Sequence, residues 1–106
     1  MAWTFLIFAG ILEIGWPLGL KLSQTTDKRF FWLVFAAVTM IASGYFLWLS
    51  QREIPIGTAY VVWTGIGAIG AFVIGIIKFE DPLTFWRIIS ALFILIGVIG
   101  LKLSHS

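Results

Sequence analysis

The sequence contains no cysteine and a single histidine, and charged residues make up only 11% of its 106 residues. Without cysteine there are no disulfide bonds and no thiol catalysis. The remaining polar residues form no metal-ligand spacing, no Ser/His/Asp set and no phosphate-binding loop, and we expect His105, in a polar C-terminal tail, to be solvated. The composition argues against an enzyme, and we expect neither a metal nor a cofactor.

No part of the chain concentrates charged residues of one sign. Seven Lys and Arg stand against five Asp and Glu, and they are scattered along the chain. A nucleic-acid surface needs a basic patch or stripe. We therefore expect no nucleic-acid partner.

Apolar residues make up 60% of the chain, which is too high a share for a soluble domain. A membrane helix needs about 20 mostly apolar residues, and the windows that qualify are 3–21, 30–50, 55–77 and 83–102. The first window lacks the features of a cleaved signal peptide, so we expect it to be retained. Short loops make neighbouring helices antiparallel and put both termini on one side. The sequence predicts an all-α protein with one four-helix transmembrane domain, residues 1–106, in a lipid bilayer.

Polar and proline residues mark the expected helix ends. Residues 23–28 indicate a polar turn in which Asp27 caps the second helix, and Pro55 suits the first turn of the third. Asp81 followed by Pro82 predicts a cap and a first-turn proline for the fourth helix.

One residue breaks the apolar pattern. Glu13 lies near the middle of the first window and is the only acidic residue in any of the four. A carboxylate at that depth costs at least ~2.5 kcal/mol on insertion scales, so an intramembrane acid indicates a functional site. The alternative is a structural one, a neutral glutamic acid held by a hydrogen bond between helices.

Aromatic rings lie near this acid. Gly10 and Trp16 are each three residues from Glu13, so all three share one helix face. Aromatic rings around a buried carboxylate form a cation site, because a desolvated cation–π contact is worth ~2 kcal/mol or more. Packing against lipid or other side chains is the alternative role of each ring. A second face of the same kind, on the third window, consists of Tyr60, Trp63 and Gly67.

Two further positions could belong to the site. Ser43 is the polar residue inside the second window, at about the depth of Trp63, and both a functional role and a local backbone bond remain open for it. Thr39 is a second candidate, although such hydroxyls often bond only the carbonyl four residues earlier. Pro17 removes the hydrogen bond to the carbonyl of Glu13, so we expect a freed or kinked backbone there, with a tolerated kink as the alternative.

Glycines mark close packing or bending. The third window is the richest in glycine, and Gly65 and Gly67 favour a helix that bends or moves. Gly97 and Gly100 favour close packing late in the fourth window, where they suggest a dimer seam; facing lipid is the alternative.

Two motifs of the chain form a familiar pattern. They are Gly10-x-x-Glu13-x-x-Trp16 with Leu20-Lys21, and Pro55-x-Gly57-Thr58-Ala59-Tyr60-x-x-Trp63-Thr64-Gly65-Ile66-Gly67-Ala68. With four expected helices in 106 residues, they resemble the small multidrug resistance family over essentially the whole chain. Within it, Trp16 after the glutamate, the third-window motif and the ending over residues 97–102 are more similar to the guanidinium exporter subtype than to the broad quaternary-ammonium subtype.

The resemblance implies an antiparallel homodimer, in the plasma (inner) membrane, that exchanges protons for a small organic cation. Glu13 of both subunits would bind protons or the cation in competition, Gly10 would allow close approach, and the fourth helix would hold the dimer together. The other residues of the pocket would be Trp16, Ser43, Tyr60 and Trp63.

Several alternatives stay open. One is a roomier pocket for quaternary ammonium or choline-like cations, because Gly15, Pro17 and Gly44 reduce the bulk of side chains. Others are a non-transporting membrane subunit and a passive cation channel.

The distribution of basic residues bears on the orientation of the chain in the membrane. Five basic residues lie on the side away from the termini and two on the side of the termini, which favours termini outside. An antiparallel homodimer needs both orientations. We take this charge bias to be too weak to fix one, with a heterodimer as the alternative.

Overall fold

The computed structural model describes residues 1–105, without the side chain of His105, so the predicted solvation of that side chain lies outside the described part. The chain folds into α1 (Ala2–Thr25), α2 (Arg29–Ser50), α3 (Ile56–Phe79) and α4 (Phe85–His105). All four helices are long and apolar enough to cross a membrane. The predicted all-helical, four-span fold is confirmed.

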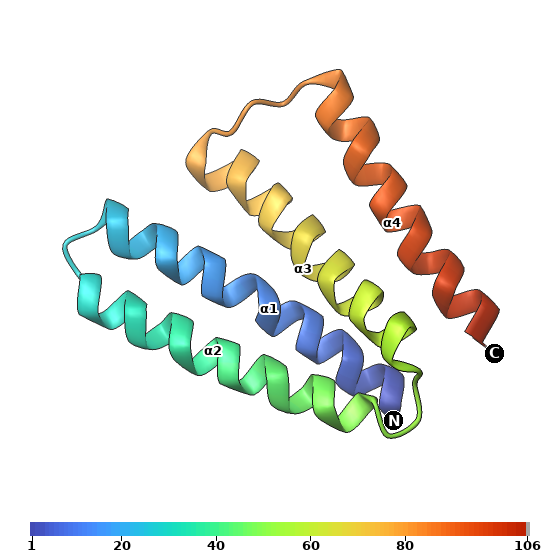
Figure 1. Cartoon of the computed structure of the whole chain (residues 1–106). Helices are drawn as coiled ribbons and strands as arrows, with labels where there is room; N and C mark the ends of the chain where they lie inside the picture. Colours follow the sequence, from blue (N-terminus) through green and yellow to red (C-terminus); the bar gives the residue numbers. More distant parts are fainter. Residues whose placement is uncertain (106) are drawn as a thin grey trace.

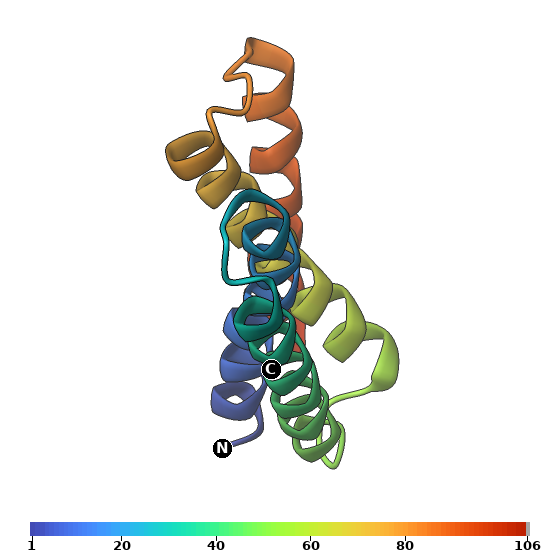
Figure 2. The ribbon, with the colours of Figure 1, turned by 90° about the vertical axis from the view of Figure 1, so that its left-hand side faces the viewer.

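The helices form one layer in the order α2, α1, α3, α4 (Figure 1). The chain measures 46 × 34 × 16 Å along its principal axes, so the layer is little thicker than one helix with its side chains, about 10–12 Å. Helix α1 packs on α2 and on α3, whereas α2 and α3 barely touch. In the view turned by 90°, α1 and α2 cross in front of the other two helices (Figure 2). Both termini lie at the same end of the layer (Figure 1), as expected.

Helices α1 and α2 approach closely because two glycines of α1 face α2. A Cβ atom on Gly19 would lie 2.9 Å from the backbone oxygen of Trp32, and one on Gly15 would lie 2.8 Å from Cγ2 of Thr39. Both separations are too short for real atoms, so the backbones approach only where the side chain is missing. The small size of Gly15 therefore serves helix packing, and the roomier pocket that we had inferred from it is not supported at this position.

The end of α1 and the cap at the start of α2 differ from the prediction. Helix α1 continues to Thr25, four residues beyond the expected window, and the hydroxyl of Thr26 donates to the carbonyl of Leu22 at 2.7 Å. The polar turn shrinks accordingly. Lys28, not Asp27, occupies the N-cap position of α2, without a side-chain cap, so the predicted role of Asp27 is wrong.

The start of α4 is also corrected. Glu80 ends α3 in the left-handed conformation, with φ 57°, and the N–H of Asp81 donates to the carbonyl of Gly75 at 3.0 Å. Asp81 therefore closes α3 and does not cap α4, and Pro82 lies in the loop. The cap is Thr84, whose hydroxyl oxygen accepts the Arg87 N–H at 3.3 Å. Pro55 lies one residue before α3, at its N-cap.

Helix α4 is the least covered element. No residue of its membrane-length span, Phe85–Ser104, is buried, although the span is strongly apolar. The fully buried side chains gather near the N-terminal end of the layer instead, around Leu6, Ile54 and Val62. A helix that is apolar on all sides needs lipid or another protein surface around it.

We expect Gly19→Ala to destabilise the protein by about 1–3 kcal/mol, because the new Cβ would collide with a backbone atom that cannot move aside alone. Gly44→Ala is the matched control in α2, since nothing lies within 4 Å of its Cβ position. It should leave stability unchanged or raise it by about 0.5–1 kcal/mol. Thermal unfolding of the detergent-solubilised protein measures both, and equal midpoints for the two variants would contradict the packing argument.

Candidate functional site

The intramembrane carboxylate is held by a tryptophan of its own helix. The indole Nε1 of Trp16 donates a hydrogen bond to Oε1 of Glu13 at 2.8 Å. The two residues are three positions apart in α1, which places them on one face. Both are half-buried. The Trp16 indole thus orients the carboxylate. In an apolar surrounding no water is available to take its place as the hydrogen-bond donor.

Helix α3 leaves room for this carboxylate. A Cβ atom on Gly67 would lie 2.6 Å from Cγ of Glu13, so the bare backbone of Gly67 is what lets the glutamate side chain lie between α1 and α3. Gly10 serves the same helix pair one turn earlier, because its Cβ would lie 2.7 Å from Cβ of Ile66. Both predicted site glycines are buried and act through their lack of a side chain.

A second group of polar contacts joins three helices. The Ser43 hydroxyl, fully buried in α2, donates to the backbone carbonyl of Ala9 in α1 at 2.7 Å. Its oxygen accepts a hydrogen bond from Nε1 of Trp63 in α3 at 2.8 Å. Ser43 is therefore bonded between helices, whereas the hydroxyl of Thr39 donates to its own helix, to the carbonyls of Phe35 and Ala36.

Tyr60 extends this second group. Its ring lies 5.5 Å from that of Trp63, centroid to centroid, with the planes tilted by 55°. Tyr60 is 56% exposed on the surface of the single chain. Of these two rings of α3, Trp63 therefore takes part in the contacts between helices, whereas Tyr60 is mostly exposed.

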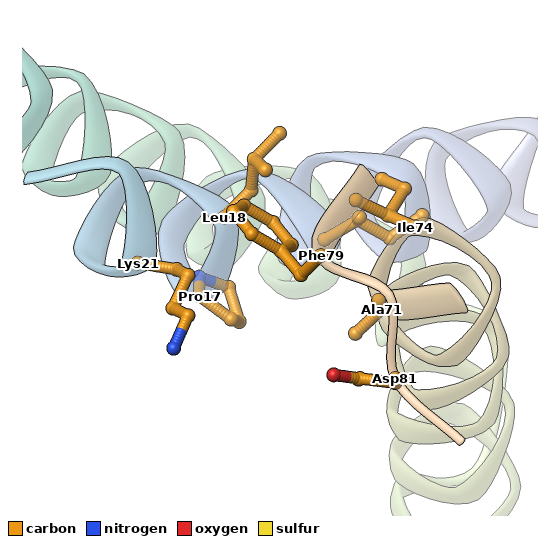
Figure 3. A pocket seen from close by; sticks show the side chains of 9 residues that line it. Pro17, Leu18, Lys21, Ala71, Ile74, Phe79 and Asp81 are labelled. Atoms are coloured by element: carbon orange, nitrogen blue, oxygen red, sulfur yellow. The ribbon is translucent and has the colours of Figure 1, made fainter. Parts of the chain in front are cut away.

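A cavity of about 270 Å³ opens between α1 and α3 on the side of the 80–84 loop. Ile14 and Pro17 line it, so it reaches the turn of α1 that follows Glu13. Figure 3 shows the Lys21 ammonium and the Asp81 carboxyl group at its rim, from α1 and from the segment after α3. The cavity therefore lies beside the candidate site, on the side of the membrane face opposite the termini, and Glu13 itself does not line it.

The remaining predicted residues lie elsewhere. Gly65 packs against Val98 of α4, on a different side of α3 from Gly67. Gly97 and Gly100 have nothing within 4 Å of their Cβ positions, so neither packs within the chain. Pro17 lies inside the continuous helix α1.

Sequence reasoning missed two partners in these contacts. The carbonyl of Ala9 accepts the Ser43 hydroxyl, but a backbone acceptor leaves no signal in the sequence. Ile66 fills the space beside Gly10, and it resembles any other apolar residue of the third window. Opposite charges at the ends of two apolar windows, as in Lys21 and Asp81, were a signal that could have indicated the cavity.

The comparison with known proteins decides the family. The model of the family described as Small Multidrug Resistance protein matches residues 1–96 of this chain. The chain belongs to this family. A guanidinium exporter of Yersinia pseudotuberculosis is 43% identical over 104 residues, which cover 98% of this chain and 99% of the relative. Guanidinium exporters of Escherichia coli K12 and Citrobacter freundii are 41% and 38% identical, each over 98% of both chains.

The resemblance inferred from the sequence motifs is thereby confirmed. The family and its named relatives are transporters, so the expectation that this chain is not an enzyme is confirmed as well. With four membrane-length helices, this small multidrug resistance protein is a multi-pass membrane protein.

We expect Ser43→Ala to destabilise the protein by about 1–3 kcal/mol, because it removes both bonds between helices and leaves the Trp63 N–H without an acceptor in an apolar interior. Ser50→Ala is the matched control: Ser50 is also fully buried, but its hydroxyl donates only to Leu47 of its own helix. Thermal unfolding in detergent should separate the two. A loss for Ser50→Ala as large as that for Ser43→Ala would mean that the bond between helices adds nothing.

Proposed function

We propose that this protein is a proton-coupled antiporter that exports small organic cations of the guanidinium type across the plasma (inner) membrane. The observation that carries the proposal is the Glu13 carboxylate near the middle of α1, oriented by the Trp16 indole and facing the bare backbone of Gly67. The names of the relatives, guanidinium exporters at 38–43% identity, support the same cargo.

The chemistry of the site suits a planar cation. A carboxylate accepts up to about four hydrogen bonds, and the Trp16 N–H takes one position on Oε1. Guanidinium offers parallel N–H groups that match the two carboxylate oxygens. The rings of Trp16, Trp63 and Tyr60 supply faces for cation–π contact. A quaternary ammonium cation has no N–H donor for the carboxylate oxygens, so this site favours guanidinium.

Exchange follows from competition for one group. A proton on Glu13 removes the charge that holds the cation, and a bound cation stabilises the charged carboxylate that the proton would neutralise. Protons that enter from outside would release the cargo there, and the cation would displace the proton inside. The empty, unprotonated carrier must not change sides, or protons would leak and the export of the cation would no longer be coupled to them.

The transporting unit in this proposal is an antiparallel homodimer. One chain forms a single layer, so Glu13 and Tyr60 are only partly covered. A second copy would enclose them and bring two Glu13 carboxylates into one site. The exposed apolar surface of α4 and the open space at Gly97 and Gly100 support a seam between copies there.

Residues of α1 and α3 would carry the change of sides. Pro17 leaves the carbonyl of Glu13 without its usual partner inside α1. Gly65 and Gly67 reduce the side-chain contacts of α3 with α4 and α1, so this helix could bend or slide where the site lies. These roles are part of the proposal for Pro17, Gly65 and Gly67.

Glu13→Gln should abolish cation-coupled currents in liposomes that contain the purified protein, because the amide cannot exchange a proton for a cation. In the wild type, guanidinium should give larger currents than methylguanidine, choline or tetraethylammonium. Lowering the pH on the cation side should raise the apparent KM for guanidinium, since the proton competes for the same carboxylate.

Glu53→Gln is the control, because Glu53 is exposed in the loop before α3 and should leave the currents unchanged. Larger currents with the quaternary cations would favour the broader exporter. Currents that need no proton exchange would indicate a channel, and silence with all four cations would support a non-transporting subunit.

The topology can be tested with single cysteines, because the chain has none of its own. A membrane-impermeant thiol reagent should label about half of Thr26→Cys and about half of Arg52→Cys in intact cells, since these loops lie on opposite sides in chains of both orientations. Full labelling of one variant and none of the other would show a fixed topology, and would favour a heterodimer with an oppositely oriented partner.

A further inference from the structure

A second groove lies between α3 and α4, on the far side of α3 from Glu13. It has a volume of about 340 Å³. Its walls are apolar or small, with Ala68, Ile69 and Phe72 from α3 and Ala91 and Ile94 from α4. The two alanines leave the groove open where larger side chains would close it. The proposed cation site does not include any of these residues.

The positively charged side chain of Arg87 lies at one end of this groove. The guanidinium of Arg87 lies over the ring of Phe72, 5.1 Å from its centroid. Its Nε–H is buried and makes no hydrogen bond within the described part of the chain. The Arg87 side chain as a whole is only partly buried, so the other N–H groups of its guanidinium can bond an acceptor from outside the chain.

The depth of Arg87 identifies the kind of acceptor. Arg87 lies in the first turn of α4, beside Trp86, which is 74% exposed as expected for a ring at the headgroup level. From Arg87 the groove continues to Ile94, seven residues and about 10 Å deeper into the apolar region. A charged donor at headgroup depth above an apolar groove matches a phosphate that carries a hydrocarbon chain.

We infer that the groove between α3 and α4 binds an anionic phospholipid, with its phosphate on the Arg87 guanidinium and one acyl chain along Phe72, Ala91 and Ile94. Basic pockets between membrane helices recognise lipid headgroups in this way. Lys78, at the end of α3 on the same membrane side, adds positive charge near the headgroup. A cationic cargo is excluded from this groove by the charge of Arg87. A second copy over the groove would displace the lipid.

The test is native mass spectrometry of the full-length protein, released from detergent with equal amounts of phosphatidylglycerol and phosphatidylcholine that have the same acyl chains. The wild type should retain phosphatidylglycerol with a preference of about tenfold, the effect of one charge-assisted contact. Arg87→Gln should lose this preference. Ala91→Phe, which keeps the charge but fills the groove, should reduce the occupancy of both lipids.

Two matched controls separate this site from general attraction to basic residues. Arg52 also lies over an aromatic ring, 5.1 Å from the centroid of Trp48, but it is exposed at the other end of the helices. Arg52→Gln and Lys78→Gln should both keep most of the preference. Equal retention of the two lipids by the wild type would overturn the inference. A second copy of the chain over the groove would give this result.

Two further results would also overturn it. The first is an unchanged preference in Arg87→Gln. The second is displacement of phosphatidylglycerol by excess inorganic phosphate, because that would make the site one for free anions. If Arg87→Gln does not fold, Ala91→Phe and the phosphate competition on the wild type decide the question by themselves.

Discussion

The lack of water in the bilayer core is the constraint on which this structure depends. Every polar group at that depth must find a partner in the protein, because none is available from solvent. Trp16 meets this need for Glu13, and Trp63 and the carbonyl of Ala9 meet it for Ser43. The second set of bonds ties α1, α2 and α3 together. Part of what holds the fold at mid-membrane is therefore made of residues that we assign to the cation site.

The lipid that surrounds the helices also changes how they pack. Lipid is as apolar as the side chains, so burial of apolar surface does not drive the helices together, and close contact must come from small residues. The bare backbones of Gly15 and Gly19 bring α1 against α2, and that of Gly67 admits the Glu13 side chain between α1 and α3. One layer results, with a carboxylate covered from one side. That half-covered state is why the proposed transport unit needs a second copy.

The sequence predicted the number, type and approximate limits of the helices, because a run of about 20 apolar residues in one chain has few other uses. It was wrong about two of the helix caps, those assigned to Asp27 and Asp81. Asp81 and Pro82 match the pattern of a helix start, yet Asp81 bonds back to the carbonyl of Gly75 and Thr84 takes the cap. Several polar residues near a helix end could each serve as the cap, and the path of the loop chooses among them.

The sequence by itself determined which chemical groups the site can use. These are a single acid, Glu13, near the middle of one span, the ring of Trp16 three residues from it, and the ring of Trp63 in the third span. Helical spacing places Trp16 beside Glu13 because both lie on one element. Only the tertiary structure decided that Ser43 bonds Ala9 and Trp63, that Gly67 faces the glutamate and that Arg87 stands over a groove. These contacts join different helices, and helical periodicity within one segment does not say which neighbour a face will meet.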